Sequence, residues 1–197
     1  MALTKVQAEG INLADTFAYT GTVTGTQGLV KLSSTAISTA VTAVAFTNVD
    51  TTYDFYQVNF FCTPASNNVN FFARFKDSGG SDLTGSIYGG GAVTEGGGTD
   101  DESNGTTSLL IASSQGNASG ESCSGTIIFG PVTGVTDVSP CGFFGFYTGA
   151  NENGNHQSRI MTRGIVPGQN QVIRGITFKF SSGNISNGTF TLYGIVK

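Results

Sequence analysis

Charged side chains are scarce in this sequence. Only 11% of its residues are Asp, Glu, Lys or Arg, well below the usual quarter. The chain is not a disordered one, because 15 Phe and 6 Tyr supply large apolar side chains for a core. The net charge of −4 excludes the basic footprint of a nucleic-acid binder, so we expect no nucleic-acid partner.

Basic residues are missing altogether from a long internal stretch. No Lys or Arg occurs between Asp77 and Ser158, whereas acidic residues recur there up to Glu152. The simpler interpretation is a solvated acidic pole that keeps the protein soluble through like charge. The alternative is a binding end that takes a cation or excludes anionic partners.

Residues for catalysis or metal binding are also few. The single histidine, His156, lies among turn residues, and no Gly-x-Ser-x-Gly motif accompanies it, which argues against a Ser-His-Asp hydrolase. One histidine and three scattered cysteines give no zinc-ligand spacing. The sequence has no Trp for sugar stacking, and the acidic residues lack a rigid setting, which argues against a glycosidase. We therefore expect no enzyme activity and no cofactor.

The three cysteines, Cys62, Cys123 and Cys141, are widely spaced and contain no CxxC pair. An odd number without a disulfide framework indicates folding in a reducing cytoplasm, with thiols that act as small buried apolar groups. Apolar alternation begins at Cys123 and again at Cys141, which predicts a core location for both.

Long apolar runs are absent as well. The longest uncharged candidate, residues 32–49, contains seven Ser or Thr and tends to alternate, as a strand and loop would. The first residues lack the apolar stretch of a secretory signal. We expect neither secretion nor membrane insertion.

Glycine turns and short alternating apolar segments are abundant. The pattern predicts about ten strands and no helix, and it predicts a hairpin at Pro64–Asn68. Such a series is typical of an all-β, antiparallel β-sandwich, jelly-roll-like in type. The expected strands are 37–46, 53–61, 69–75, 83–88, 108–112, 123–129, 141–147, 159–166, 171–181 and 189–196.

Two aromatic clusters, Phe143–Tyr147 and Phe71–Phe72, place neighbouring rings on opposite faces of their strands. Half of these rings must therefore lie away from the sandwich core. Because large exposed apolar patches are unusual on monomers, the second face is either a subunit interface or a patch covered by the N-terminal segment. We favour the interface.

The sequence divides into an N-terminal extended arm, residues 1–30, and a sandwich domain, residues 31–197. The arm is poor in apolar residues and cannot offset its own ordering entropy, so we expect it to anchor the protein to another subunit or particle. Its expected apolar contacts are Leu3, Val6, Ile11, Leu13 and Phe17.

The longest irregular stretch in the sandwich domain is expected at residues 89–107. Loops of that length are often functional, so its acidic residues form a candidate exposed recognition loop. They are Glu95, Asp100, Asp101 and Glu102. Asp77 and Asp82 are weak candidates for calcium, because they offer hard oxygen ligands but match no EF-hand loop. A solvated loop without metal is the default.

The segment from Ser182 to Ile195 reads SGNI-x-x-GTF-x-LYGI. It resembles the C-terminal signature of small β-sandwich proteins in the virions of marine tailed phages, cyanophages among them. Residues 1–6, 10–17 and 21–25 resemble the opening of the same proteins, whereas residues 75–160 carry no resemblance.

The resemblance implies a non-enzymatic virion exterior protein that assembles in the bacterial host cytoplasm. It implies a short fibre or spike, commonly a homotrimer, anchored by its arm to capsid, tail or portal proteins, with an exposed head that can contact a host surface glycan. One alternative is a capsid decoration protein that stabilises the head shell. A third is a carbohydrate-binding module. Because jelly rolls serve many functions, the fold alone does not separate the three.

Overall fold

The computed structural model describes residues 28–94, 103–130, 132, 142–165 and 172–196. The predicted arm contacts, Leu3 to Phe17, lie outside these residues. So do the loop carboxylates Glu95, Asp100, Asp101 and Glu102, and also Cys141.

Twelve strands are present in the described part of the chain, and these residues form no helix that could cross a membrane. The strands are β1 (Leu29–Ile37), β2 (Val44–Phe46), β3 (Phe55–Pro64), β4 (Val69–Lys76), β5 (Tyr88–Thr94), β6 (Ser103–Thr106), β7 (Leu109–Gln115), β8 (Cys123–Gly130), β9 (Gly142–Ala150), β10 (His156–Ile165), β11 (Gly175–Phe180) and β12 (Ile185–Ile195).

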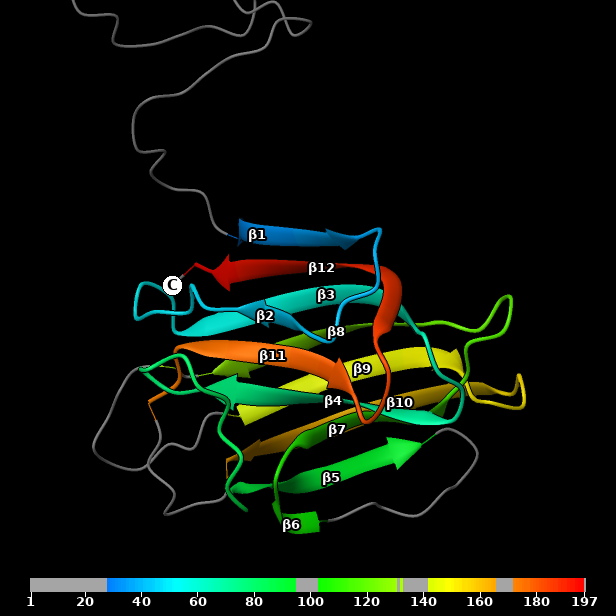
Figure 1. Ribbon diagram of the computed structural model, residues 1–197. Helices are drawn as coiled ribbons and strands as arrows, with labels where there is room; N and C mark the ends of the chain where they lie inside the picture. The colour runs from blue at the N-terminus through cyan, green and yellow to red at the C-terminus, as the bar shows by residue number, and fades with distance from the viewer. Residues whose placement is uncertain (1–27, 95–102, 131, 133–141, 166–171, 197) are drawn as a thin grey trace, which may run out of the picture.

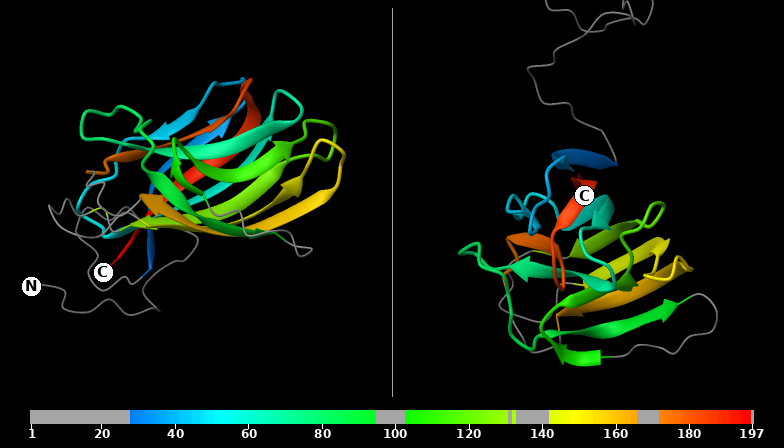
Figure 2. Two further views of the ribbon diagram at one scale, coloured as in Figure 1. Left: turned by 90° about the horizontal axis from the view of Figure 1, so that it is seen from below. Right: turned by 45° about the vertical axis from the view of Figure 1, so that its right-hand side comes forward.

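These strands form two antiparallel sheets that pack face to face, which confirms the predicted β-sandwich. The large sheet has the order β1-β12-β3-β8-β9-β10-β5-β6, and the small sheet has the order β2-β11-β4-β7. Figure 1 looks onto the small sheet with β8, β9 and β10 behind it, and Figure 2 shows the two layers from other sides. β1 begins at Leu29, so the last two residues of the predicted arm belong to the sandwich.

The topology is that of a jelly roll with a widened sheet. If β5, β6, β9 and β10 are set aside, eight strands remain in two four-stranded sheets, β1-β12-β3-β8 and β2-β11-β4-β7. When these eight strands are numbered 1 to 8 along the chain, the two sheets have the orders 1-8-3-6 and 2-7-4-5. This is the strand arrangement of a jelly roll, which contains two Greek keys. The other four strands extend the large sheet beyond β8.

Three local predictions are wrong. Residues 37–46 are not one strand, because β1 ends at Ile37 and β2 starts only at Val44. Residues 83–87 are not a strand either. Pro64–Asn68 does not close a hairpin, because β3 belongs to the large sheet and β4 to the small one. The connection crosses between layers, which local turn chemistry does not reveal.

The predicted long loop at residues 89–107 is also wrong at both of its ends. Gly89 and Gly91 pair in β5 with Gly164 and Thr162 of β10, and β6 follows at residues 103–106. A glycine run resembles a loop in the sequence because glycine has no side chain that could show an apolar alternation. Backbone hydrogen bonds between strands do not require such side chains.

The centre of the core is a cluster of phenylalanines from both sheets. Phe71 of β4 lies 4.9 Å from Phe180 and 5.4 Å from Phe60, measured between ring centroids. Phe178 and Phe190 complete the cluster, with centroids 5.4 Å apart. On β3, alternate residues Tyr56, Val58 and Phe60 are buried and form one wall of the core. These rings come from both sheets and pack the two layers against each other.

Buried tyrosines fasten loops to the strands through their hydroxyl groups. Tyr56 donates to the carbonyl of Asp50 at 2.8 Å and accepts from the Asp50 amide at 2.9 Å. Burial raises the pKa of Tyr56 to about 12, so its hydroxyl keeps the proton that it donates. Tyr88 likewise accepts from the Phe75 amide and donates to the carbonyl of Leu83. The irregular segment before β5 is therefore held by the Tyr88 hydroxyl together with a short backbone pairing to the end of β4, where the Leu83 amide donates to the carbonyl of Phe75.

Gly188, within the GTF part of the C-terminal signature, occupies a position that only glycine fits. Its φ is +147°, and a Cβ there would lie 2.2 Å from the carbonyl oxygen of Phe61 on β3. The close approach lets β12 pair with β1 and β3 at the point where its register with β3 has just shifted. This glycine of the motif thus serves the central pairing of the sandwich.

Candidate interaction surface

The outer face of the large sheet is the surface that turns away from the small sheet. The pairing register aligns its side chains in rows across the strands. One row contains Asn59 of β3, Thr126 of β8, Phe146 of β9 and Ile160 of β10. The next row towards the start of β3 contains Gln57, Ile128, Phe144 and Thr162.

Large apolar side chains gather where these rows cross β9 and β10. Phe144 and Phe146 are each 50% exposed and Ile160 is 57% exposed, while Ile128 beside them is half-buried. We call Ile128, Phe144, Phe146 and Ile160 the outer patch. Phe55 and Phe61 stand near the two ends of β3 on the same face, 44% and 47% exposed. The prediction that alternate aromatic residues point away from the core is confirmed on β9, and on β4, where Phe71 is buried and Phe72 is half-buried on the other side.

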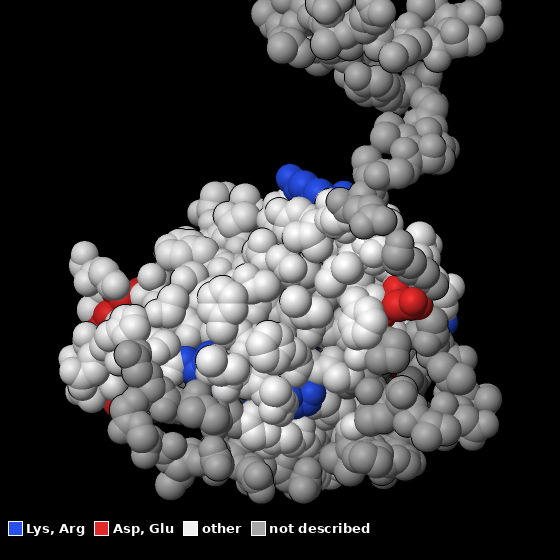
Figure 3. Space-filling model, turned by 180° about the vertical axis from the view of Figure 1, so that it is seen from behind, with Lys and Arg blue, Asp and Glu red and all other residues white. Residues whose placement is uncertain are grey.

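From β12 to β10 the register places no charged side chain on this face within the described residues. Lys31, on the edge strand β1, faces the same side opposite Tyr193. Figure 3 views this side of the molecule: most of it is uncoloured, with blue at the upper edge and at two small places in the lower half, and red towards the left and right ends. From β12 to β10 the described part of this face is therefore uncharged, in a protein with a net charge of −4.

A polar stripe separates the outer patch from the β1 edge. Asn59 accepts hydrogen bonds from Gln57 at 2.8 Å and from Thr126 at 3.0 Å. Closer to the edge, the hydroxyls of Ser34 and Thr191 lie 3.0 Å apart. These bonds engage Oδ1 of Asn59 and the two hydroxyls, so an interface that covers the stripe need not break them.

Two shallow hollows flank the outer patch. The first, of about 270 Å³, is lined mainly by apolar groups that include Phe55, Ile128 and Phe144. The second, of about 380 Å³, is polar and is lined by Ser122, Ser124, Thr148 and His156 together with glycines and Ala150. In the second hollow the hydroxyl oxygen of Thr148 lies 2.8 Å from Nε2 of His156. The single histidine is the first residue of β10 and does not lie in the predicted loop.

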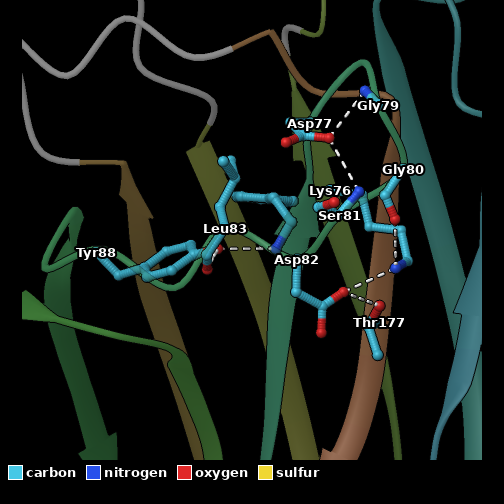
Figure 4. A network of polar contacts seen from close by, with 10 residues as sticks. Lys76, Asp77, Gly79, Gly80, Ser81, Asp82, Leu83, Tyr88 and Thr177 are labelled. Carbon is cyan, nitrogen blue, oxygen red and sulfur yellow. Dashed lines mark hydrogen bonds and ion pairs between the residues drawn. The ribbon is translucent and has the colours of Figure 1, made fainter.

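Asp77 and Asp82, the candidate calcium ligands, each have protein partners (Figure 4). Asp77 accepts from the amides of Gly79 and Ser81 at 2.8 and 2.9 Å, which closes the turn after β4. Asp82 accepts from Nζ of Lys76 at 2.8 Å and from the hydroxyl of Thr177 at 2.7 Å. Among the described residues no three His, Cys, Asp or Glu side chains gather as metal ligands. The contacts of both aspartates are structural.

Asp82→Asn is expected to lower the free energy of unfolding by about 1 kcal/mol at neutral pH. Burial alone raises the pKa of the Asp82 carboxyl, but the hydrogen bonds from Lys76 and Thr177 outweigh it and lower that pKa below 3.8. The ionised carboxylate therefore stabilises the fold above pH 3.8, and this contribution is lost as the pH falls further. Urea unfolding from pH 7 down to pH 2 measures it. A wild-type advantage that persists unchanged at the acid end would contradict this assignment.

Sequence reasoning anticipated the rings of the outer patch but not its aliphatic members. Ile128 and Ile160 belong to segments predicted as strands, yet their position beside Phe144 and Phe146 depends on the register of three strands. The alternating period of residues 159–166 was the available signal. It indicates which side chains share a face, but not which strand lies next to which.

No family model, no curated protein and no solved structure matches this chain.

Proposed function

We propose that this chain is a non-enzymatic structural protein of a tailed-phage virion exterior, of the short fibre or spike type. In this proposal its copies associate through the outer patch. The observation that carries the proposal is the neutral, aromatic outer face of the large sheet. The resemblance of the two ends of the chain to marine phage virion proteins supplies the setting.

The chemistry of the outer face favours a second copy of the chain as the occupant. Phe144, Phe146 and Ile160 expose half or more of their surface, whereas monomers rarely leave such a cluster uncovered. A partner with a charged surface would find no complementary charge among the described residues of β12 to β10. Two copies of this face bury their rings without bringing like charges together. A threefold arrangement, as the resemblance implies, satisfies the same requirement.

The absence of enzyme activity remains part of the proposal. Its support is that the candidate groups are engaged elsewhere: His156 contacts Thr148, and Asp77 and Asp82 hold a turn and an ion pair. In the polar hollow the hydroxyls of Ser122 and Ser124 lie near His156, but no carboxylate is among the described residues that line it.

The test is electron microscopy of particles of the phage that encodes this chain, with the copy number of the chain in each particle measured. A few to a few dozen copies at the tail or a vertex is the expected result. Hundreds of copies spread over the head would establish the alternative, a decoration protein that stabilises the shell. Particles that lack the chain altogether would refute both.

The polar hollow favours a second candidate function, binding of a host glycan. Ser124 and Thr148 present hydroxyls, and Phe61 pairs with Ser124 in the register and so offers an exposed ring beside them. Sugars match such a combination of hydroxyls and an apolar face. Binding of the isolated protein to a glycan array, lost in Thr148→Ala and retained in Ser34→Ala, would support this function. A wild-type protein that binds no glycan would exclude it.

A further inference from the structure

Two cysteines on neighbouring strands of the large sheet stand directly opposite each other. Cys62 of β3 and Cys123 of β8 are partners in the antiparallel register, and their Sγ atoms lie 3.3 Å apart. Both side chains are buried, with 0% and 1% of their surface exposed, and both are free thiols. Cys123 also directs its thiol to the carbonyl of Cys62 at 3.4 Å.

This geometry is suited to a covalent bond. Directly opposed residues of an antiparallel pair have Cα atoms roughly 4.5–5.5 Å apart, within the range of roughly 4.4–6.8 Å that disulfides span. Rotation of the two side chains about χ1 can bring the sulfurs together without moving either backbone. The alternative, that both thiols serve only as small core groups, does not require them to face each other.

We propose that Cys62 and Cys123 form a latent disulfide: two thiols while the protein folds in a reducing compartment, and a cystine once it meets an oxidant. The oxidant is a low-molecular-weight disulfide such as oxidised glutathione. The purified chain is sufficient to form the bond. Only the event that exposes the protein to an oxidant in nature, the release of a virion from the host, rests on the proposed function.

The reaction is thiol–disulfide exchange in two steps. The thiolate of one cysteine attacks a sulfur of the oxidised glutathione, which breaks the reagent's S–S bond and leaves a mixed disulfide with one glutathione thiolate expelled. The second cysteine, as thiolate, attacks the protein sulfur and expels the other glutathione. The protein loses two protons and two electrons and gains one S–S bond, while the reagent becomes two thiols.

Burial sets the rate of this exchange. Burial first, and then the hydrogen bond with Cys123, raise the pKa of the Cys62 thiol well above its ordinary value, so little thiolate exists in the folded state. The reagent must also reach sulfurs that are closed off from solvent. We expect oxidation to proceed through openings of the β3–β8 pair, slowly in buffer and faster in urea below the unfolding midpoint.

The experiment uses the full chain with Cys141→Ser, so that only the two opposed cysteines remain. The protein is incubated with oxidised glutathione in sub-denaturing urea, returned to buffer and digested without reductant. Peptide mass spectrometry is expected to find Cys62 joined to Cys123, with the mass lowered by two hydrogens. The bond closes a loop of 61 residues, so Tm should rise by about 10 °C and fall back when a reductant is added.

The matched control is Cys62→Ser in the same background, for which Tm should not depend on the oxidant. If that variant does not fold, the parent chain with and without reductant gives the same comparison. The proposal is overturned if the joined peptide does not form under these conditions, or if its formation lowers Tm. Neither result touches the proposed function, which depends on where the chain lies in a particle.

Discussion

Phe146→Glu is expected to abolish self-association of the protein and leave its fold intact. Phe146 lies in the middle of the outer patch, between Thr126 of β8 and Ile160 of β10 in the register, and half of its surface is exposed. An interface that covers this ring would have to bury a carboxylate without a partner, and two copies would bring like charges together. The dissociation constant should rise by at least about 30-fold.

Sedimentation velocity over a range of protein concentrations measures this effect. Thr189→Glu is the matched control, because Thr189 is an exposed residue on the same face of the large sheet, on β12, which β3 and β8 separate from Phe146 on β9. It should associate as the wild type does. A wild-type protein that stays monomeric at every concentration would refute the interface, as would equal association of the two variants.

Phe71→Ala should be among the most destabilising single substitutions in this chain, with a loss of about 4 kcal/mol in the free energy of unfolding. Phe71 is fully buried and contacts rings of both sheets, Phe60 and Phe190 on one side and Phe178 and Phe180 on the other. Its removal leaves a cavity between the layers, which neighbouring strands cannot close without breaking their register. Urea unfolding should show a lower midpoint with an unchanged m-value.

The neighbouring residue supplies the control. Phe72 points to the outer side of the small sheet, where Arg74 and Lys179 lie over its ring at 5.3 and 5.7 Å from the centroid. Phe72→Ala removes these cation–π contacts but creates no cavity, so it should cost about 1 kcal/mol or less. Similar losses for both variants would show that the aromatic cluster is not the centre of the core.

Alternation along the sequence was sufficient to predict the sandwich and the strands with a clear inner face. β3 and β4 place apolar residues at every second position, as β12 does at Phe190 and Leu192, and the structure buries those positions. The period-2 pattern carries this information because one face of each strand packs on the core.

Pairing partners could not be read in the same way. β3 and β4 are adjacent in the chain, and the four-residue connection at residues 65–68 is rich in turn formers and resembles a hairpin, yet the two strands belong to different sheets. β5 was hidden for another reason, because Gly89 to Gly91 offer no side-chain pattern at all. Predicting the outer patch required both kinds of missing information, since β9 and β10 belong to the widened part of the sheet, which continues into β5 and β6.

The pairing of β1 with β12 has a consequence for how the protein is made. Ser34 and Thr191 share a hydrogen bond although they are 157 positions apart, and β12 stands between β1 and β3 in the large sheet. On the ribosome, β1 emerges first and waits without a partner while every intervening strand is translated. Contacts of such long range make folding slow, on the order of milliseconds to seconds for all-β domains. The eight-strand jelly-roll frame therefore cannot close while β1 to β11 are being synthesised. We expect its two sheets to be completed only after β12 has left the exit tunnel.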